Sequence, residues 1–358
     1  FSGAWVMAYT TIDDPSAHFQ TVEYTGDGNS GRAVTNSGNS NLQPDWVWIK
    51  YLTAGVSHVT YDSSRGATKR LYIDFASTEA TQSEGVQSFD SDGFTLGNAS
   101  ASNGNTIPFA AWQWHANGGT TSSNTGGSIT STVQANTDAG ISILTYTGTG
   151  SAATIGHGLG KAPAWIIVKS RTTSANWTVR HHSTTNNYDF LSLNTTDAAT
   201  ANDGAWTQTD PTTSVFSIGT ATAVNQNTIG YVAYCFAEIQ GFSKFGKYTG
   251  NGNANGPFVY TGFKPAFLLV KSVGARNWIL FDSTRDPDNL VNEYVYSNQS
   301  SAEGQSSTNG YDFLSNGFKT RNTYNDGNVS GEKYLYMAFA ENPFVTSDDG
   351  GSIPTTAR

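Results

Sequence analysis

The chain has 358 residues, of which 13% are charged and 13% aromatic, and its net charge at neutral pH is -9. This aromatic content excludes intrinsic disorder. The acidic balance, without any cluster of Lys and Arg, excludes a nucleic-acid-binding surface, and no apolar run reaches the roughly 20 residues that span a bilayer. Abundant Gly, Ser, Thr and Asn between short apolar runs predict an all-β protein with many tight turns.

The N-terminal region is similar to a segment near the other end of the chain. Residues 5–9, Trp-Val-Met-Ala-Tyr, resemble residues 335–339, Leu-Tyr-Met-Ala-Phe. We therefore expect residues 1–20 to be the end of a preceding unit or an N-terminal strand. The same likeness predicts that the chain is the C-terminal part of a longer protein or a processed product.

From about residue 21, one pattern occurs three times in the same order. The tripeptide Tyr-Thr-Gly occupies residues 24–26, 146–148 and 248–250. A Pro and an apolar run ending in Lys follow at 44–50, 163–169 and 265–271. Aromatic segments close the copies at 112–114, 234–238 and 337–341. Ordered recurrence at nearly constant spacing predicts one structural unit copied three times.

Each landmark has a physical interpretation. A Pro cannot donate to a β-ladder, so it is expected at the start of a strand, and the apolar run after it predicts a buried strand. Lys50, Lys169 and Lys271 end these runs, and we expect their stems to lie on the sheet with the ammonium groups in water. Units of about 100 residues with seven or eight strands predict three tandem β-sandwich repeats of jelly-roll or lectin-like type.

These landmarks define the expected boundaries. The Gly-, Ser- and Thr-rich segment before the second unit predicts a flexible linker. The short second junction contains Phe242 and Phe245 and predicts rigid packing of units two and three. The expected order is repeat 1 at 21–116, linker at 117–127, repeat 2 at 128–238, repeat 3 at 239–345 and a C-terminal tail at 346–358.

Several of these strings resemble a known family. Residues 156–163, 242–265, 341–344 and 354–358 are similar to a repeat family in virion proteins of tailed phages, particularly marine phages. The resemblance implies a tail-fibre-like structural protein on the virion surface, assembled in the host cytoplasm, whose ligand is uncharacterised. It also implies other virion proteins as partners, and fibres of this type are usually homotrimers. It carries no catalytic residue.

No catalytic or metal-binding constellation is evident in the sequence. The Gly-x-Gly-x-x-Gly string at 26–31 precedes another strand and not a helix, so we interpret it as a hairpin turn. The candidate acids for glycoside hydrolysis are Asp62, Asp282, Glu238 and Glu341, and the sequence does not place any two of them together. Glu238 and Glu341 recur at strand ends, which favours structural roles, and the single Cys235 is expected to be buried. We therefore predict a protein that is not an enzyme and needs no cofactor or metal.

Three residues are candidate ligand contacts. Trp206 lies outside the repeat pattern in a presumed loop, where an exposed ring could stack on a sugar. His181 and His182 replace the Asp-Ser pair that the first and third copies carry. The repetition, the lack of a catalytic constellation and the resemblance to phage virion proteins together imply a phage tail fibre or appendage that binds host surface glycan. The resemblance implies a homo-oligomer, expected to be a trimer, and no membrane insertion is expected. Capsid decoration and glycan depolymerisation are the alternatives.

Overall fold

The chain forms three β-sandwich units of one topology, which confirms the all-β prediction. The computed structural model describes residues 9–345. In each unit a large antiparallel sheet faces a small one. The short hydrophobic runs between turn residues become strands because they can bury one or both faces between the two sheets.

Unit one contains a six-stranded and a three-stranded sheet. The large sheet has, in spatial order, β1 (Phe19–Thr25), β9 (Pro108–Trp114), β3 (Trp46–Tyr51), β4 (Val59–Asp62), β5 (Lys69–Tyr72) and β6 (Ala80–Thr81). The small sheet has β2 (Arg32–Val34), β8 (Gly93–Leu96) and β7 (Val86–Asp90). The 3-10 helix η1 (Pro15–Ala17) precedes β1, and α1 (Ser100–Asn103) lies between β8 and β9.

Unit two repeats this order with two additional strands at one edge. Its large sheet has β10 (Ser122–Asn124), β11 (Ser131–Asn136), β12 (Ile141–Thr147), β19 (Gly230–Phe236), β14 (Trp165–Ser170), β15 (Thr178–His181), β16 (Asp189–Ser192) and β17 (Thr200–Ala201). Its small sheet has only β13 (Ala153–Gly156) and β18 (Val215–Ile218), and α2 (Thr222–Asn225) corresponds to α1.

Unit three returns to the pattern of unit one. Its large sheet has β20 (Ser243–Thr249), β28 (Lys333–Pro343), β22 (Phe263–Ser272), β23 (Trp278–Asp282), β24 (Glu293–Tyr296) and β25 (Gly304–Gln305). Its small sheet has β21 (Phe258–Tyr260), β27 (Gly317–Thr320) and β26 (Tyr311–Leu314).

The repeated Tyr-Thr-Gly tripeptide fastens the first strand of each unit to the loop before its last strand. The Tyr24 hydroxyl donates to the carbonyl of Ser102 over 2.7 Å, and a Cβ on Gly26 would collide with the backbone of Gly104. Asn103, which follows Ser102, is fully buried, and its side-chain oxygen accepts a hydrogen bond from the Asp27 N–H.

The same contacts recur in the other two units. The hydroxyls of Tyr146 and Tyr248 donate to the carbonyls of Val224 and Gly327. The buried amides of Asn225 and Asn328 likewise accept from the backbone one residue after each tripeptide. These contacts explain physically why the tripeptide is repeated.

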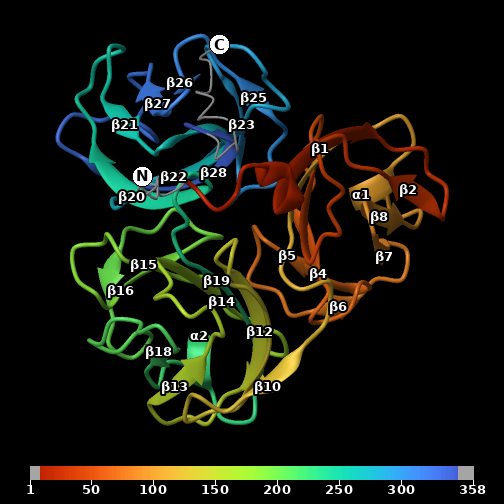
Figure 1. Cartoon of the computed structure of the whole chain (residues 1–358), viewed down its shortest axis with the longest axis vertical. Helices are drawn as coiled ribbons and strands as arrows, with labels where there is room; N and C mark the ends of the chain where they lie inside the picture. Colours follow the sequence, from red (N-terminus) through yellow and green to blue (C-terminus); the bar gives the residue numbers. More distant parts are fainter. Residues whose placement is uncertain (1–8, 346–358) are drawn as a thin grey trace, which may run out of the picture.

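The three units lie around a common centre, so the chain has pseudo-threefold symmetry (Figure 1). Equivalent aromatic rings from the three large sheets meet there: Trp114 and Phe339 have centroids 5.8 Å apart, and Phe236 and Phe339 are 5.9 Å apart. Trp46 stacks on Tyr234 of unit two with centroids 4.4 Å apart. One hydrophobic cluster therefore crosses all three units.

A second set of contacts repeats around this centre with a fixed direction. The indole N–H of Trp177 donates to the Tyr72 carbonyl of unit one, and that of Trp278 donates to the Ser192 carbonyl of unit two. His58 occupies the equivalent place in unit one, where its Nε2 lies 3.1 Å from the Tyr296 carbonyl of unit three. Each unit thus bonds to its neighbour through the same strand position, which closes the ring.

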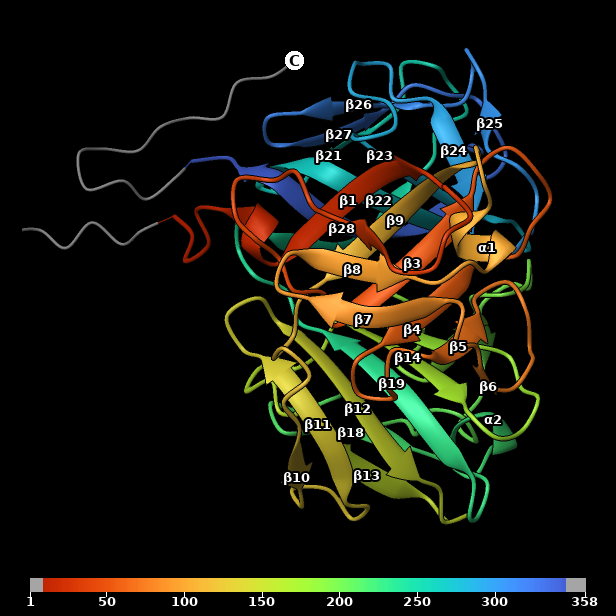
Figure 2. The ribbon, with the colours of Figure 1, turned by 90° about the vertical axis from the view of Figure 1, so that its right-hand side faces the viewer.

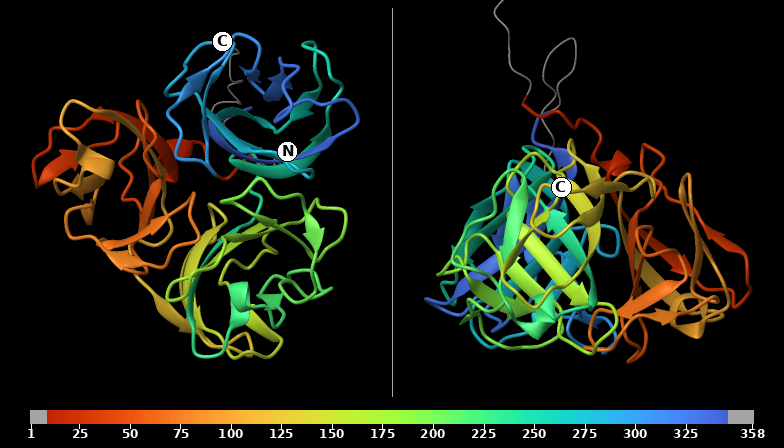
Figure 3. Two further views of the ribbon diagram at one scale, coloured as in Figure 1. Left: turned by 180° about the vertical axis from the view of Figure 1, so that it is seen from behind. Right: turned by 90° about the horizontal axis from the view of Figure 1, so that it is seen from below.

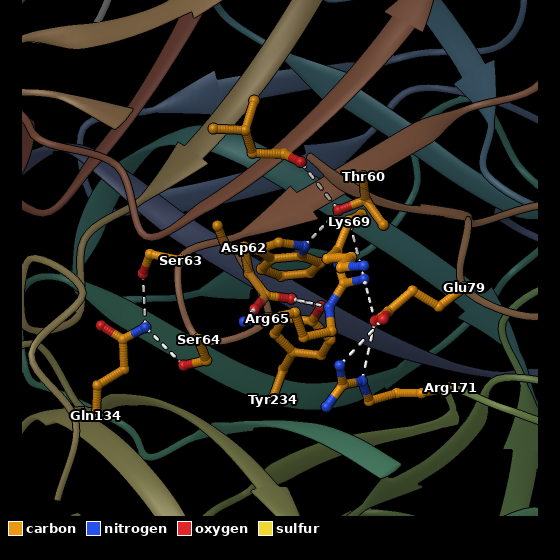
Figure 4. Close-up of polar contacts among 12 residues, drawn as sticks. Thr60, Asp62, Ser63, Ser64, Arg65, Lys69, Glu79, Gln134, Arg171 and Tyr234 are labelled. Atoms are coloured by element: carbon orange, nitrogen blue, oxygen red, sulfur yellow. Dashed lines mark hydrogen bonds and ion pairs between the residues drawn. The ribbon is translucent and has the colours of Figure 1, made fainter. Parts of the chain in front are cut away.

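A buried ion pair lies at the interface of units one and two (Figure 4). Asp62 accepts hydrogen bonds from Arg65 and from the Tyr234 hydroxyl, the latter over 2.6 Å. Arg65 also contacts Glu79, which Arg171 of unit two binds through two nitrogens. Since the Asp62 and Arg65 side chains are both fully buried, each needs the other to remain charged there.

The ion pair returns between units three and one but is missing between units two and three. Asp282 pairs with Arg285 and accepts from the Trp112 indole over 3.0 Å. In unit two the strand position of Asp62 is held by His181, opposite Trp165. The facing position in unit three is Met337, which has no donor to offer. Loss of the acid on one side thus accompanies loss of the donor on the other.

Two expectations about the units are wrong. The predicted flexible linker, 117–127, contains β10, which pairs with β11, and its Gly118 and Gly119 N–H groups both donate to Asp45. Unit one consequently packs against both other units and is not separate from them (Figure 3). The rigid contact expected only between units two and three thus extends to all three units.

The three repeated lysines are also placed differently from the prediction. Lys50, Lys169 and Lys271 are fully buried at the unit interfaces. The Lys169 ammonium donates to the carbonyls of Ala76 in unit one and Ala175. Burial is the main cause that lowers the pKa of each lysine to about 8. The sequence missed this because the sheet face expected to meet water meets another unit.

Arg65→Met tests the ion pair. Leaving Asp62 buried without its partner should lower the free energy of unfolding by about 3–5 kcal/mol. Arg171→Met is the matched control, because it removes a partly exposed partner of the same Glu79 and should cost about 1 kcal/mol. Urea unfolding of both variants measures the difference, and equal costs would contradict the assignment.

The buried lysines predict how stability changes with pH. Their pKa is about 8 in the folded chain and 10.5 as the ordinary value, so the unfolded chain binds more protons between these pH values. The free energy of unfolding should therefore rise above about pH 8. It should fall again above about pH 10, because burial raises the pKa of several tyrosines and holds them neutral in the folded chain only.

Lys169→Met isolates one of the three groups. It should reduce the rise in stability between pH 8 and 9.5 by about a third, because one of three shifted titrations is removed. Urea unfolding at each pH measures it. Burial raises the pKa of the Cys235 thiol, so this group lowers stability as the pH rises. It is one group against the three lysines, so the net stability should still rise. A flat profile in the unsubstituted chain would reject the interpretation.

Candidate functional site

Two of the three predicted ligand contacts are buried, so those predictions are wrong. Trp206 is fully buried and packs edge-on against Phe216, with centroids 6.4 Å apart. His181 is also fully buried, and its Nδ1 accepts from the Ser183 N–H. Burial lowers the pKa of His181 to about 3, so the ring is neutral. The sequence showed that both residues depart from the repeat, but departure from a repeat does not establish exposure.

His182 is the predicted residue that reaches the surface. Its Nε2 lies 2.8 Å from the carbonyl of Phe245, where it donates across the junction between units two and three. It lines a cavity of about 410 Å³ together with Lys161, Arg180, Asp210, Pro211 and Glu238. His182 follows the last residue of β15, and its ring lies beside that of His181, with centroids 5.1 Å apart, although only His182 is exposed.

The four candidate acids all have partners in ion pairs, which agrees with the structural roles expected for Glu238 and Glu341. Asp62 and Asp282 belong to the buried ion pairs described above. Glu238 pairs with Lys244 over 2.8 Å, and Glu341 pairs with Lys264 over 2.9 Å. The glycine string at 26–31 leads into strand β2, so no helix N-terminus is available there for a phosphate.

Within residues 9–345, no group of three His, Cys, Asp or Glu residues is placed to hold a metal ion. The same residues contain no helix that is long and apolar enough to cross a membrane. Surface cavities are therefore the features of residues 9–345 that could hold a ligand.

A cavity at one end of the pseudo-threefold axis has the composition of a sugar site. We call this end the far pole, because β3, β14 and β22 finish there, whereas Tyr9 and Phe344 lie together at the other end (Figure 2). The cavity measures about 460 Å³ and lies between units one and three. Its lining consists of Asp74, Phe75, Asn298, Gln299, Ser300 and Ser301.

Phe75 gives this cavity an exposed aromatic wall. Its side chain is 53% exposed, more than most large apolar residues of the described chain, and it packs edge-on against Tyr72. The guanidinium of Arg70 lies over the ring of Tyr72, 4.3 Å from its centroid. An apolar ring held at the mouth of a polar cavity is suited to the CH face of a sugar.

Asp74 gives the cavity an acceptor. It is 8% exposed, and its Oδ1 accepts from the His58 N–H. Burial raises the pKa of this carboxyl, and a hydrogen bond from the Ser57 side chain and the ammonium of Lys50 act against that rise. Among the described residues, the Ser301 hydroxyl is buried without a hydrogen-bond partner. Buried polar atoms that lack partners usually bind water or a ligand.

The symmetry of the chain shows which part of this cavity is structural. Asn194 and Asn298 occupy the positions equivalent to Asp74. Their side-chain oxygens accept from the backbone N–H groups of Trp177 and Trp278. The repeat therefore needs a side-chain oxygen at this position but not a charge. The carboxylate and the neighbouring Phe75 are particular to unit one.

Comparison with known proteins identifies the family of the chain. Residues 14–343 match a family described as a domain of unknown function (DUF7483), and the chain belongs to it. The matched region spans all three units. No curated protein and no solved structure matches the chain.

Sequence analysis missed both the cavity and the residues that build the fold around it. Asp74 and Phe75 gave no signal, because the cavity forms only when unit three contacts unit one. The buried Asn103, Asn225 and Asn328 could have been found, since each follows its Tyr-Thr-Gly tripeptide at a nearly constant distance along the chain. Their regularity was hidden among many other asparagines.

Proposed function

We propose that this chain is an attachment module of a tailed-phage virion that binds host surface glycan at the far pole. The observation that carries the proposal is the cavity between units one and three. It combines an exposed ring, Phe75, with the carboxylate of Asp74 and the hydroxyl of Ser301, which is buried and unpartnered among the described residues. Protein sites for sugars need such stacking surfaces beside fixed polar groups.

The architecture supports the same proposal. Three units bonded around one centre form a rigid body, so a ligand at the cavity meets groups that are already held in place. The far pole is at the opposite end of this body from Tyr9 and Phe344, which leaves it accessible if the neighbouring parts of a virion lie at that other end. The phage setting rests on the resemblance of the repeats. The homotrimer stays a prediction that sedimentation can test.

Phe75→Thr and Asp74→Asn test the glycan site. The chain itself contains Thr195 and Asn194 at the equivalent positions of unit two, so both variants should fold. We expect each to weaken binding about tenfold, through the loss of ring stacking or of a charged acceptor. The measurement is binding to an array of bacterial capsule and lipopolysaccharide oligosaccharides.

Phe258→Thr is the matched control, because Phe258 is 46% exposed on β21 of unit three, away from the cavity. Binding that survives Phe75→Thr unchanged would reject the far-pole site. Release of new reducing ends from the bound glycans would instead support a depolymerase. Antibody labelling of virions separates a tail appendage from capsid decoration, since label on the head would contradict the attachment role.

A further inference from the structure

Unit two has an arginine at a buried position where the other two units have an aromatic residue. Arg180 pairs with Ile166 in the register where Tyr61 pairs with Val47 in unit one and Phe281 pairs with Leu268 in unit three. Tyr61 and Phe281 are buried aromatic residues, and the Arg180 side chain is only 3% exposed. Burying a guanidinium where an aromatic ring suffices costs desolvation, so the fold alone does not require this charge.

The surroundings of Arg180 differ as well. Units one and three complete their small sheets with β7 and β26, but the small sheet of unit two has no third strand. The corresponding stretch contains Asp210 and Pro211, and a Pro cannot donate to a β-ladder. These two residues instead form a wall of the 410 Å³ cavity that Lys161, Arg180 and His182 also line.

The guanidinium is partly engaged and partly available. Arg180 Nε donates to the carbonyl of Asn187, and Nη2 lies 2.7 Å from an oxygen of Asp210. Nη1 has no hydrogen bond to any of the described residues. The Asp210 side chain is 74% exposed, so it holds its end of the ion pair from a solvated position. The carboxylate of Asp210 therefore already binds the guanidinium. Because Asp210 is largely exposed, a ligand carboxylate could replace it.

We propose that this cavity binds the carboxylate of a small ligand, of the size of one acidic sugar residue, with Arg180 as the anchor. An arginine fork matches a carboxylate through two parallel hydrogen bonds, and Asp210 shows that the cavity accommodates this group. Lys161 adds a second positive charge, while Glu238 is neutralised by Lys244. The two positive charges of Arg180 and Lys161 and the negative charge of Asp210 leave one net positive charge. This net charge favours a ligand with one negative charge over a phosphate.

The ring of His182 defines the orientation of the rest of the ligand. In the tautomer whose Nε2 donates to the Phe245 carbonyl, Nδ1 is an acceptor. A sugar hydroxyl is a suitable donor to it. That the ligand is a sugar rests on the proposed function, whereas the carboxylate at Arg180 does not.

Titration calorimetry of the full chain with glucuronate, glucose and glucose 6-phosphate tests the proposal. We expect glucuronate to bind at least tenfold more tightly than the other two. Arg180→Lys, which keeps the charge but lacks the fork, should weaken glucuronate at least tenfold. Asp210→Asn should tighten it severalfold, because the competing carboxylate is removed.

The controls distinguish this site from the far pole. Phe75→Thr should leave glucuronate binding unchanged, and Arg180→Tyr, which restores the side chain of unit one, should abolish it while circular dichroism remains that of the parent. Tighter binding of the phosphate, or no effect of Arg180→Lys and Asp210→Asn, would overturn the proposal. If the array result at the far pole holds while glucuronate fails to bind, this inference fails and the proposed function stands.

Discussion

The exclusion of water from the place where three equivalent sheets meet is the constraint on which the rest of the structure depends. Each large sheet buries one face on its own small sheet and the other against its neighbours, so the strands before the lysines are apolar on both faces. Aromatic residues of different units contact one another at this centre. Without that contact, Asp62 and Lys169 would be solvated residues of separate domains and not buried parts of an interface.

Burying charge at this interface has a cost that the chain offsets with matched partners. Asp62 and Asp282 each have an arginine on their own unit and a donor on the next, and the lysines are bonded to carbonyl groups. Where unit two lacks the acid, the facing position of unit three lacks the donor. Such matched loss indicates that each interface is specified by its own pairs, which fixes the order of the units around the centre.

The sequence predicted what is local and repeated, and failed where units contact each other. Spacing alone located the Tyr-Thr-Gly copies and the buried apolar strands that contain Trp46, Trp165 and Phe267, because each unit buries the same positions. The contacts of the Tyr-Thr-Gly copies were not predicted. The sequence could not predict the ring, since no feature of a repeat encodes which outer face meets which neighbour. The lysines and the segment 117–127 were misassigned for this reason. Trp206 was misplaced because a residue outside the repeat can fill a gap that the repeat leaves.

Threefold repetition within one chain separates structural from functional positions without a second sequence. A residue present in all three units, such as the asparagine after each Tyr-Thr-Gly copy, is explained by contacts that all three units make. A residue that one unit alone carries has no such explanation and must be accounted for locally. Trp206 is accounted for by packing, whereas Phe75, the charge of Asp74 and Arg180 are not, and each of these three lines a cavity. The asymmetry of the chain thus points to the same two cavities that their chemistry suggests.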